Sequence, residues 1–289
     1  MLRIPKKARR DILAAQRNEI TEYYVYRNLA KTMPSQHNKK ILEGIADCEL
    51  GHYNFWRTIS KEEVAPNRFR IAKYVLISKL LGLTFGLKLM ERGEQVAQAN
   101  YENLAKYIPL AAKIEKEEDM HEQELIGILN EERLEYVGSI VLGLNDALVE
   151  LTGALAGFTL ALQNGTLIAM AGLVTGISAS LSMAASEYLS TKSEKSSKQP
   201  GKAALYTGIA YIATVIILIL PFLLLSNLYV ALAYTMSFAI LIILFFTYYT
   251  SVAKDLSFRN RFLEMAAISL GVAALSFGVG YVVRILFDI

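Results

Sequence analysis

The chain has 289 residues, one cysteine and a formal net charge of +3 at pH 7, which results from 30 basic and 27 acidic residues. A charge this small, spread over both signs, lacks the dense Lys/Arg stripe of a nucleic-acid-binding protein, so we expect no nucleic-acid partner. One cysteine excludes an intramolecular disulfide and a CxxC metal site within the chain, and we expect Cys48 to be a small buried thiol.

The charged residues are unevenly distributed along the chain. Most Asp and Glu precede residue 136, whereas later runs such as 215–225 contain no charge. The sequence therefore predicts two domains in two solvents, a water-soluble domain at 1–133 and a membrane domain at 134–289. The basic start, residues 1–11, is not followed by the apolar core of a signal peptide, so we expect the N-terminus in the cytoplasm.

The first domain has the long amphipathic pattern of helices from Pro5 to about Arg133. Pro34, Pro66 and Pro109 stand where new helices are expected to start. We predict an all-α fold, a four-helix bundle with helices near 7–32, 35–60, 67–106 and 109–132.

Residues 71–90, within the third of these helices, are apolar enough to be mistaken for a membrane span. They carry Lys73, Lys79 and Lys88, and a lysine at the centre of a span costs about 2.5–3.5 kcal/mol. A span here would also place the carboxylates before and after it on opposite sides of the membrane. We therefore interpret the segment as a crossover helix, which can lie on the membrane surface.

Two of the four predicted helices carry a Glu and a His three residues apart, on one helical face. The first helix supplies one further Glu and the third helix two. One Glu from each of two helices and a Glu-x-x-His from each of the other two is the ligand set of di-iron carboxylate bundles. We predict a di-iron centre, with Mn²⁺ as the alternative metal, held by Glu19, Glu49, His52, Glu118 and His121 together with one or both of Glu91 and Glu94.

Other polar residues of this domain receive plainer interpretations. The third histidine, His37, is expected at the surface because it stands beside Pro34 at a helix start. Glu22, Glu122 and Glu124 are interpreted as solvated residues or as neighbours of the ligands.

The second domain contains windows of about 20 mostly apolar residues, enough for a helix to cross a bilayer core of roughly 30 Å. The windows lie near 137–162, 166–189, 203–225, 228–252 and 262–286. The connections at 191–202 and 254–261 are rich in Lys and Arg, whereas the other two connections are uncharged. The positive-inside rule then places the first domain in the cytoplasm and the C-terminus outside.

Four polar or sulfur-bearing side chains within the spans are candidates for a transport pathway: Asp146, Glu150, Met183 and Glu187. Asp146 and Glu150 are four residues apart on the first span, as are Met183 and Glu187 on the second, so each pair shares a helical face. Intramembrane carboxylates usually face a cavity, a partner or a pathway. The plainer alternatives are that Glu150 and Glu187 lie at the interfaces and that Met183 packs in the helix bundle.

These residues belong to two motifs, Gly143-Leu144-Asn145-Asp146 and Ser182-Met183 followed by Glu187-Tyr188-Leu189-Ser190, and over roughly 136–289 the chain resembles the vacuolar iron transporter family. The resemblance implies a homodimeric, proton-coupled exporter of cytosolic Fe²⁺ in which Asp146 and Met183 line the ion pathway. Ala147 departs from the family pattern, where a glycine is common. The loop after the second span keeps only Glu194 of the acidic residues found there in some members.

The first domain has a resemblance of its own, carried by Glu19 with Tyr26 and Ala30 and by Ala46-x-x-Glu49-x-x-His52. These residues resemble rubrerythrin and other ferritin-like proteins, which implies ligand roles for the Glu and His residues named above. The whole chain then resembles the membrane-bound ferritins of bacteria and archaea. That resemblance implies an integral protein of a prokaryotic cell membrane.

Three functions remain open from the sequence, and the last of them, a structural or sensor protein without flux, holds only if neither of the other two activities appears. The first is a proton-coupled exporter of Fe²⁺, with Mn²⁺ as a second cargo, whose cytoplasmic di-iron domain collects, senses or oxidises iron. The second is a membrane-tethered rubrerythrin-like peroxidase or ferroxidase, and enzymatic activity therefore stays undecided. The absence of CxxC pairs weakens the second function, because rubrerythrins normally carry their own iron–sulfur electron donor.

Overall fold

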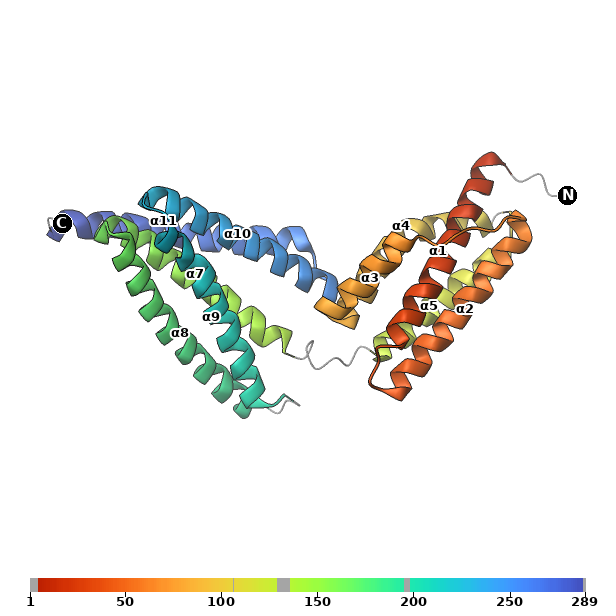
Figure 1. The fold of residues 1–289 in the computed structure, drawn as a ribbon, viewed down its shortest axis with the longest axis horizontal. Helices are drawn as coiled ribbons and strands as arrows, with labels where there is room; N and C mark the ends of the chain where they lie inside the picture. Colours follow the sequence, from red (N-terminus) through yellow and green to blue (C-terminus); the bar gives the residue numbers. More distant parts are fainter. Residues whose placement is uncertain (1–4, 106, 129–135, 195–197, 288–289) are drawn as a thin grey trace. The chain divides into compact units, whose positions relative to one another are not determined.

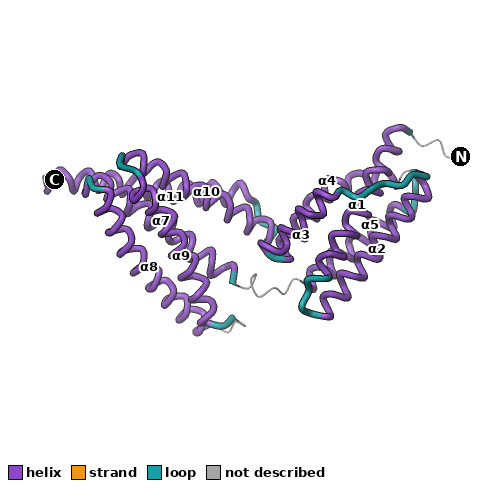
Figure 2. Tube along the Cα trace, viewed as in Figure 1, coloured by secondary structure: helices purple, strands orange, loops and turns teal. Residues whose placement is uncertain are grey.

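The computed structural model describes residues 5–105, 107–128, 136–194 and 198–287, without the side chains at 91, 94–103, 115, 119, 122–124 and 126–128. The chain divides into two compact units, residues 1–131 and 132–289. The secondary structure of the described residues in both units is helical, with loops between the helices (Figure 2).

The described residues of the N-terminal unit form five helices (Figure 1). They are α1 Lys6–Ala30, α2 Gln36–Ser60, α3 Arg68–Leu81, α4 Leu83–Ala105 and α5 Ala111–Ile128. Side chains at two helix starts supply the caps that free backbone N–H groups require: Ser35 accepts from the N–H of Asn38, and Asn67 accepts from the N–H of Arg70. The starts predicted near 35 and 67 therefore lie within one residue of the observed helices.

The single helix predicted for 67–106 is wrong, because Gly82 separates α3 from α4. Gly82 has φ 102° and ψ 151°, a backbone conformation that is essentially restricted to glycine. α4 then packs back against α3 so closely that a Cβ on Gly86 would overlap Ser78. The predicted crossover segment thus becomes a helical hairpin, and α3 also contacts α1.

Two apolar clusters fill the N-terminal unit, and the polar residues of interest lie between them along the helices. One cluster contains Leu29, Leu42 and Leu125, and the other contains Ile12, Trp56 and Ile114. On α1, α2 and α5 the stretches between the two clusters hold the predicted ligands. The bundle therefore places carboxylates and imidazoles in its interior with apolar packing at both ends.

The described residues of the C-terminal unit form α7 Val137–Leu162, α8 Gly165–Ser193, α9 Pro200–Leu224, α10 Leu228–Ala253 and α11 Phe258–Phe287. All five are long and apolar enough to cross a membrane, since 25 helical residues extend about 37 Å. The prediction of five spans is confirmed, with the second and fifth helices longer than expected. The protein is an integral membrane protein.

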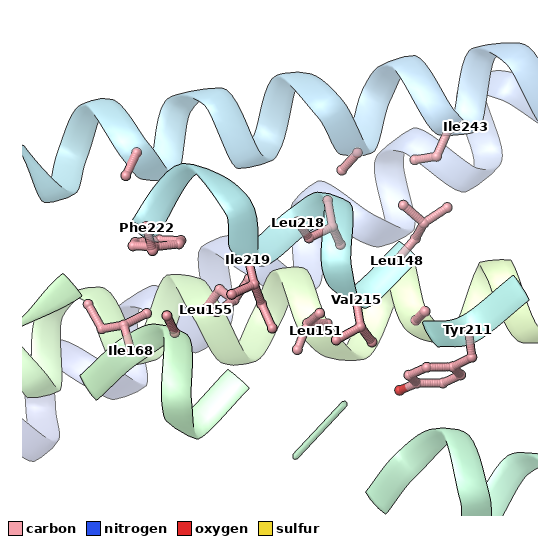
Figure 3. Close-up of a cluster of buried hydrophobic side chains, with 14 residues drawn as sticks. Leu148, Leu151, Leu155, Ile168, Tyr211, Val215, Leu218, Ile219, Phe222 and Ile243 are labelled. Carbon is pink, nitrogen blue, oxygen red and sulfur yellow. The ribbon is translucent and has the colours of Figure 1, made fainter. Parts of the chain in front are cut away.

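The apolar core of the membrane unit lies where α7 meets its neighbours. Leu151 and Leu155 of α7 lie beside Val215 and Ile219 of α9 (Figure 3). Leu148 of α7 lies toward Ile243 of α10, and Ile168 of α8 joins the same cluster. Small residues permit close approach of the backbones, as is usual in membrane helices: a Cβ on Gly143 would overlap the carbonyl of Thr207 on α9. α7 therefore contacts α8, α9, α10 and α11.

Candidate metal centre

The predicted ligands of α1, α2 and α5 converge in the interior of the N-terminal unit. Glu19, Glu49, His52 and Glu118 each place one ligand atom within 4.8 Å of the others. Glu19 and Glu49 are 1% exposed and His52 is 5% exposed. His121 is also buried, and its ring centroid lies 5.9 Å from that of His52.

Two of the carboxylates each face both histidines through different oxygen atoms. The Oε2 of Glu49 lies 3.6 Å from His52 Nδ1, and its Oε1 lies 3.3 Å from His121 Nδ1. Glu118 repeats this pattern, with Oε1 at 3.0 Å from His52 Nδ1 and Oε2 at 3.6 Å from His121 Nδ1. Glu19 completes the His52 side, with its Oε2 at 3.4 Å from Nδ1. Each of the two carboxylates therefore presents one oxygen to either histidine, an arrangement suited to metal binding.

The protonation of the cluster reflects burial and the close approach of opposite charges. Burial raises the pKa of Glu19 well above its ordinary value. Burial acts in the same direction on Glu49, but the contacts with His121 and His52 outweigh it and lower the pKa of Glu49 to about 2. Burial opposes the charged form of His121, yet Glu118 and Glu49 raise its pKa to about 11. The pKa of His52 is raised for the same reason. Protons on the imidazoles thus occupy the place where a cation would neutralise the carboxylates.

The donor set fits a divalent iron or manganese ion. Carboxylate oxygens and imidazole nitrogens are ligands for these metals. The Nδ1 atoms of His52 and His121 are buried and make no hydrogen bond of normal geometry in the described part of the chain. Buried polar atoms without such partners are costly unless a ligand satisfies them. The residues present are therefore suited to hold metal, with both Nδ1 atoms as the nitrogen donors.

Glu117, which the sequence did not single out, contacts the opposite side of the His52 ring. The Nε2 of His52 lies 3.0 Å from Glu117 Oε2, and Lys113 Nζ lies 3.3 Å from Glu117 Oε1. The contact with His52 lowers the pKa of Glu117, and the carboxylate accepts the Nε2–H. A carboxylate in this position fixes the ring orientation and the tautomer that leaves Nδ1 free for a metal. No sequence signal distinguishes Glu117 from the other acidic residues of its helix.

Trp56 is a second unpredicted neighbour of the cluster. Its indole Nε1–H donates to Glu19 Oε1 at 3.2 Å, and the side chain is fully buried. Trp56 lies four residues after His52 and seven after Glu49, on the same face of α2. This spacing would have allowed the sequence to predict that Trp56 lies beside the ligands of α2. Trp56 holds the Glu19 carboxylate while leaving Oε2 directed toward His52.

Several expectations for this unit can now be compared with the structure. Cys48 is exposed, so the prediction of a buried thiol is wrong. Cys48, His52, Lys113 and Glu117 line a cavity of about 300 Å³, which reaches the ring of His52. His37 is exposed, as predicted.

The remaining carboxylates of the predicted set differ in how far the structure describes them. Glu22 is buried rather than solvated. The side chains of Glu91 and Glu94, and those of Glu122 and Glu124, lie outside the described residues, although α4 and α5 include these positions.

The predicted pathway residues lie on the two membrane helices α7 and α8. Asp146 is half-buried on α7, and Met183 of α8 packs against the apolar core of the membrane unit. Glu187 accepts a hydrogen bond from Ser139 Oγ of α7 at 2.5 Å. Glu150, which is exposed, accepts one from Tyr211 of α9 at 2.8 Å. The hydrogen bond of Glu187 therefore links α8 to α7, and that of Glu150 links α7 to α9.

Comparison with known proteins bears on the membrane unit. The family model described as VIT family matches residues 137–199, which contain all of α7 and α8 and therefore all four predicted pathway residues. No curated protein and no solved structure matches the chain. The first two membrane helices of this integral membrane protein are thus similar to those of the VIT family, the vacuolar iron transporters.

Proposed function

We propose that the protein is an exporter of Fe²⁺, with Mn²⁺ as a second cargo, and that its N-terminal unit is a cytoplasmic metal-binding domain that collects, senses or oxidises iron. The observation that carries the proposal is a cluster of two buried carboxylates, the half-buried Glu118 and two buried imidazoles in the same chain as two membrane helices similar to the VIT family. The orientation follows from the basic loops: N-terminal unit inside and C-terminus outside. A homodimer in a prokaryotic cell membrane is part of the proposal.

The membrane helices carry residues suited to move a divalent cation. Asp146 and Met183 combine a carboxylate with a thioether, and sulfur favours transition metals over Mg²⁺ or Ca²⁺. α7 and α8, which hold these residues, pack against each other. Charged side chains within a bilayer raise the free energy of insertion, and they usually face a pathway or a partner group. Asp146 and Met183 are therefore assigned to the ion pathway, with Glu150 and Glu187 alongside them.

Export requires a driving force. Moving a divalent cation outward against an inside-negative potential of 100 mV costs about 4.6 kcal/mol. Two protons that move inward by way of Asp146, Glu150 or Glu187 return about 4.6 kcal/mol at this potential, because each carries one elementary charge down it. The proposed mechanism is therefore proton-coupled antiport.

The N-terminal unit would hold its metal through Glu19, Glu49, His52, Glu118 and His121, with Glu91 and Glu94 of α4 as further proposed ligands. A bound iron pair supplies the change between Fe²⁺ and Fe³⁺. Glu49 and Glu118 neutralise the positive charge, Glu117 and Trp56 orient His52 and Glu19, and the apolar clusters on either side limit the access of water.

The second candidate function, a membrane-tethered peroxidase or ferroxidase, is favoured by one observation. The 300 Å³ cavity lined by Cys48, His52 and Glu117 is large enough for a small oxidant to approach the centre. In this case the membrane helices would serve mainly as an anchor.

The first prediction separates the two functions. Purified full-length protein is reconstituted in liposomes, and Fe²⁺ flux and peroxide consumption are measured with and without an imposed pH gradient. Asp146→Ala is expected to lower the flux by about tenfold or more, since a transport carboxylate is lost, and to leave peroxide consumption unchanged. The control is Glu63→Gln, which removes an exposed carboxylate outside the membrane unit.

Three results would count against the proposal. Full flux in the Asp146→Ala variant would remove the pathway assignment, and flux that ignores the pH gradient would remove the proton coupling. Peroxide consumption without any Fe²⁺ flux in the wild type would favour the tethered enzyme.

A further inference from the structure

α3 is apolar on two opposite faces, which is unusual for a helix at the surface of a water-soluble bundle. One face packs inward: Tyr74 and Ser78 are buried, and Ile71 and Val75 contact the apolar cluster around Leu42. The opposite face also carries large apolar side chains, and these are exposed among the described residues. Phe69 is 78% exposed, Leu76 57% and Leu80 65%.

The charges of α3 are of one sign. Arg68, Arg70, Lys73 and Lys79 lie within the helix, and no Asp or Glu occurs between residues 68 and 81. Arg68, Lys73 and Lys79 are exposed, whereas Arg70 donates to Asn18 Oδ1 at 2.8 Å. The exposed face thus combines apolar groups with three cationic side chains.

The length of α3 decides how it could meet a bilayer. Fourteen residues extend about 21 Å, too little for a hydrocarbon core of roughly 30 Å. Helices that bind in the plane of a membrane carry large apolar side chains with Lys and Arg beside them, and their attraction to anionic lipid adds to the burial of apolar area. Lysine stems extend along apolar surface while the ammonium groups reach the headgroups. The first membrane helix also follows the N-terminal unit closely in sequence, because eight residues separate the end of α5 from the start of α7.

We propose that the outer face of α3, formed by Arg68, Phe69, Lys73, Leu76, Lys79 and Leu80, lies on the anionic lipid surface of the bilayer that the same chain spans. The three apolar side chains enter the boundary between headgroups and acyl chains, and the three cations bind lipid phosphates. The contact is independent of the metal and of transport. It anchors the N-terminal unit to the membrane plane at a second point besides its covalent link to α7.

The test places a fluorophore on α3 in the full-length protein. Cys48→Ala removes the native exposed thiol, and Leu76→Cys then supplies a single labelling position. Labelled protein is inserted into nanodiscs of phosphatidylcholine alone or with phosphatidylglycerol, and quenching by nitroxide-labelled lipid is compared with quenching by aqueous iodide. The matched control is Lys40→Cys, an exposed position on α2.

The expected result is lipid quenching at Leu76→Cys that is severalfold stronger than at Lys40→Cys and that rises with phosphatidylglycerol. Lys73→Glu with Lys79→Glu is expected to abolish the rise, and a retained unfolding temperature of the N-terminal unit shows that this variant still folds. Equal iodide quenching at both positions in every nanodisc overturns the proposal. Shielding from iodide without any quenching by nitroxide-labelled lipid also overturns it, because the face is then covered by protein.

Discussion

At the scale of single residues, the candidate metal centre contains side chains that position the proposed ligands as well as the proposed ligands themselves. Glu117 contacts one nitrogen of His52 while the other nitrogen faces Glu19, Glu49 and Glu118. Trp56 donates to Glu19 in the same way from the other end of the cluster. Trp56 is also the one tryptophan of the chain, so its fluorescence reports directly on this centre.

Glu117→Gln is predicted to weaken metal binding at the N-terminal centre by about 10-fold, since loss of a carboxylate behind a ligating histidine typically costs 10–100-fold in affinity. The measurement is the change in Trp56 fluorescence during anaerobic titration of the full-length protein with Fe²⁺ or Mn²⁺. The control is Asp47→Asn, which removes an exposed carboxylate of α2. Unchanged affinity in Glu117→Gln, with Asp47→Asn as reference, would remove the positioning role.

At the scale of elements, the interruption between α3 and α4 is the main departure from the predicted four helices. The apolar pattern continues through residues 67–106, so nothing in the periodicity marks a break. Gly82 alone allows one because of its backbone conformation, and the close contact of Gly86 with Ser78 then fixes the hairpin. The break separates α3 from α4, and one apolar face of α3 is exposed among the described residues.

Gly82→Ala is predicted to lower the free energy of unfolding of the N-terminal unit by about 1–3 kcal/mol, because a Cβ is strained in this backbone conformation. Denaturant unfolding of the full-length protein, followed by Trp56 fluorescence, measures the change. Gly44→Ala on α2 is the matched control: its Cβ would meet nothing within 4 Å, and the substitution should stabilise by about 0.5–1 kcal/mol. If both variants have the same stability, the strain at Gly82 does not hold the hairpin.

At the scale of the whole molecule, the chain consists of two compact units with different chemistry. The N-terminal unit carries a buried cluster suited to retain metal, and the membrane unit carries a few carboxylates and a methionine suited to pass it. In the proposed function the first unit supplies the second. Metal retention and flux should therefore respond separately to substitution.

His52→Ala combined with His121→Ala is predicted to raise the Fe²⁺ concentration for half-maximal efflux from cells by about tenfold, the size of effect expected when ligands of a metal site are lost, without changing the maximal rate. The membrane pathway is intact in this variant, so saturating iron restores full flux. The control is His37→Ala, because His37 is exposed and outside the cluster. A lower maximal rate at unchanged half-saturation would show instead that the centre acts in the transport step.

The sequence predicted the helical class and the five spans, which the structure confirms, and it proposed a ligand set of which Glu19, Glu49, His52 and Glu118 lie together. Hydropathy and helical periodicity are local properties that a linear reading contains. The sequence also identified the Glu-x-x-His pairs, since three residues along a helix fix a shared face. The tertiary structure decided which side chains of different helices meet: both oxygens of Glu49 and of Glu118 on two histidines, Glu117 behind His52, and Trp56 on Glu19. It also decided that Cys48 is exposed and that α3 is a separate helix with an exposed apolar face. These features depend on how helices far apart in the chain pack together, and neither composition nor spacing contains that information.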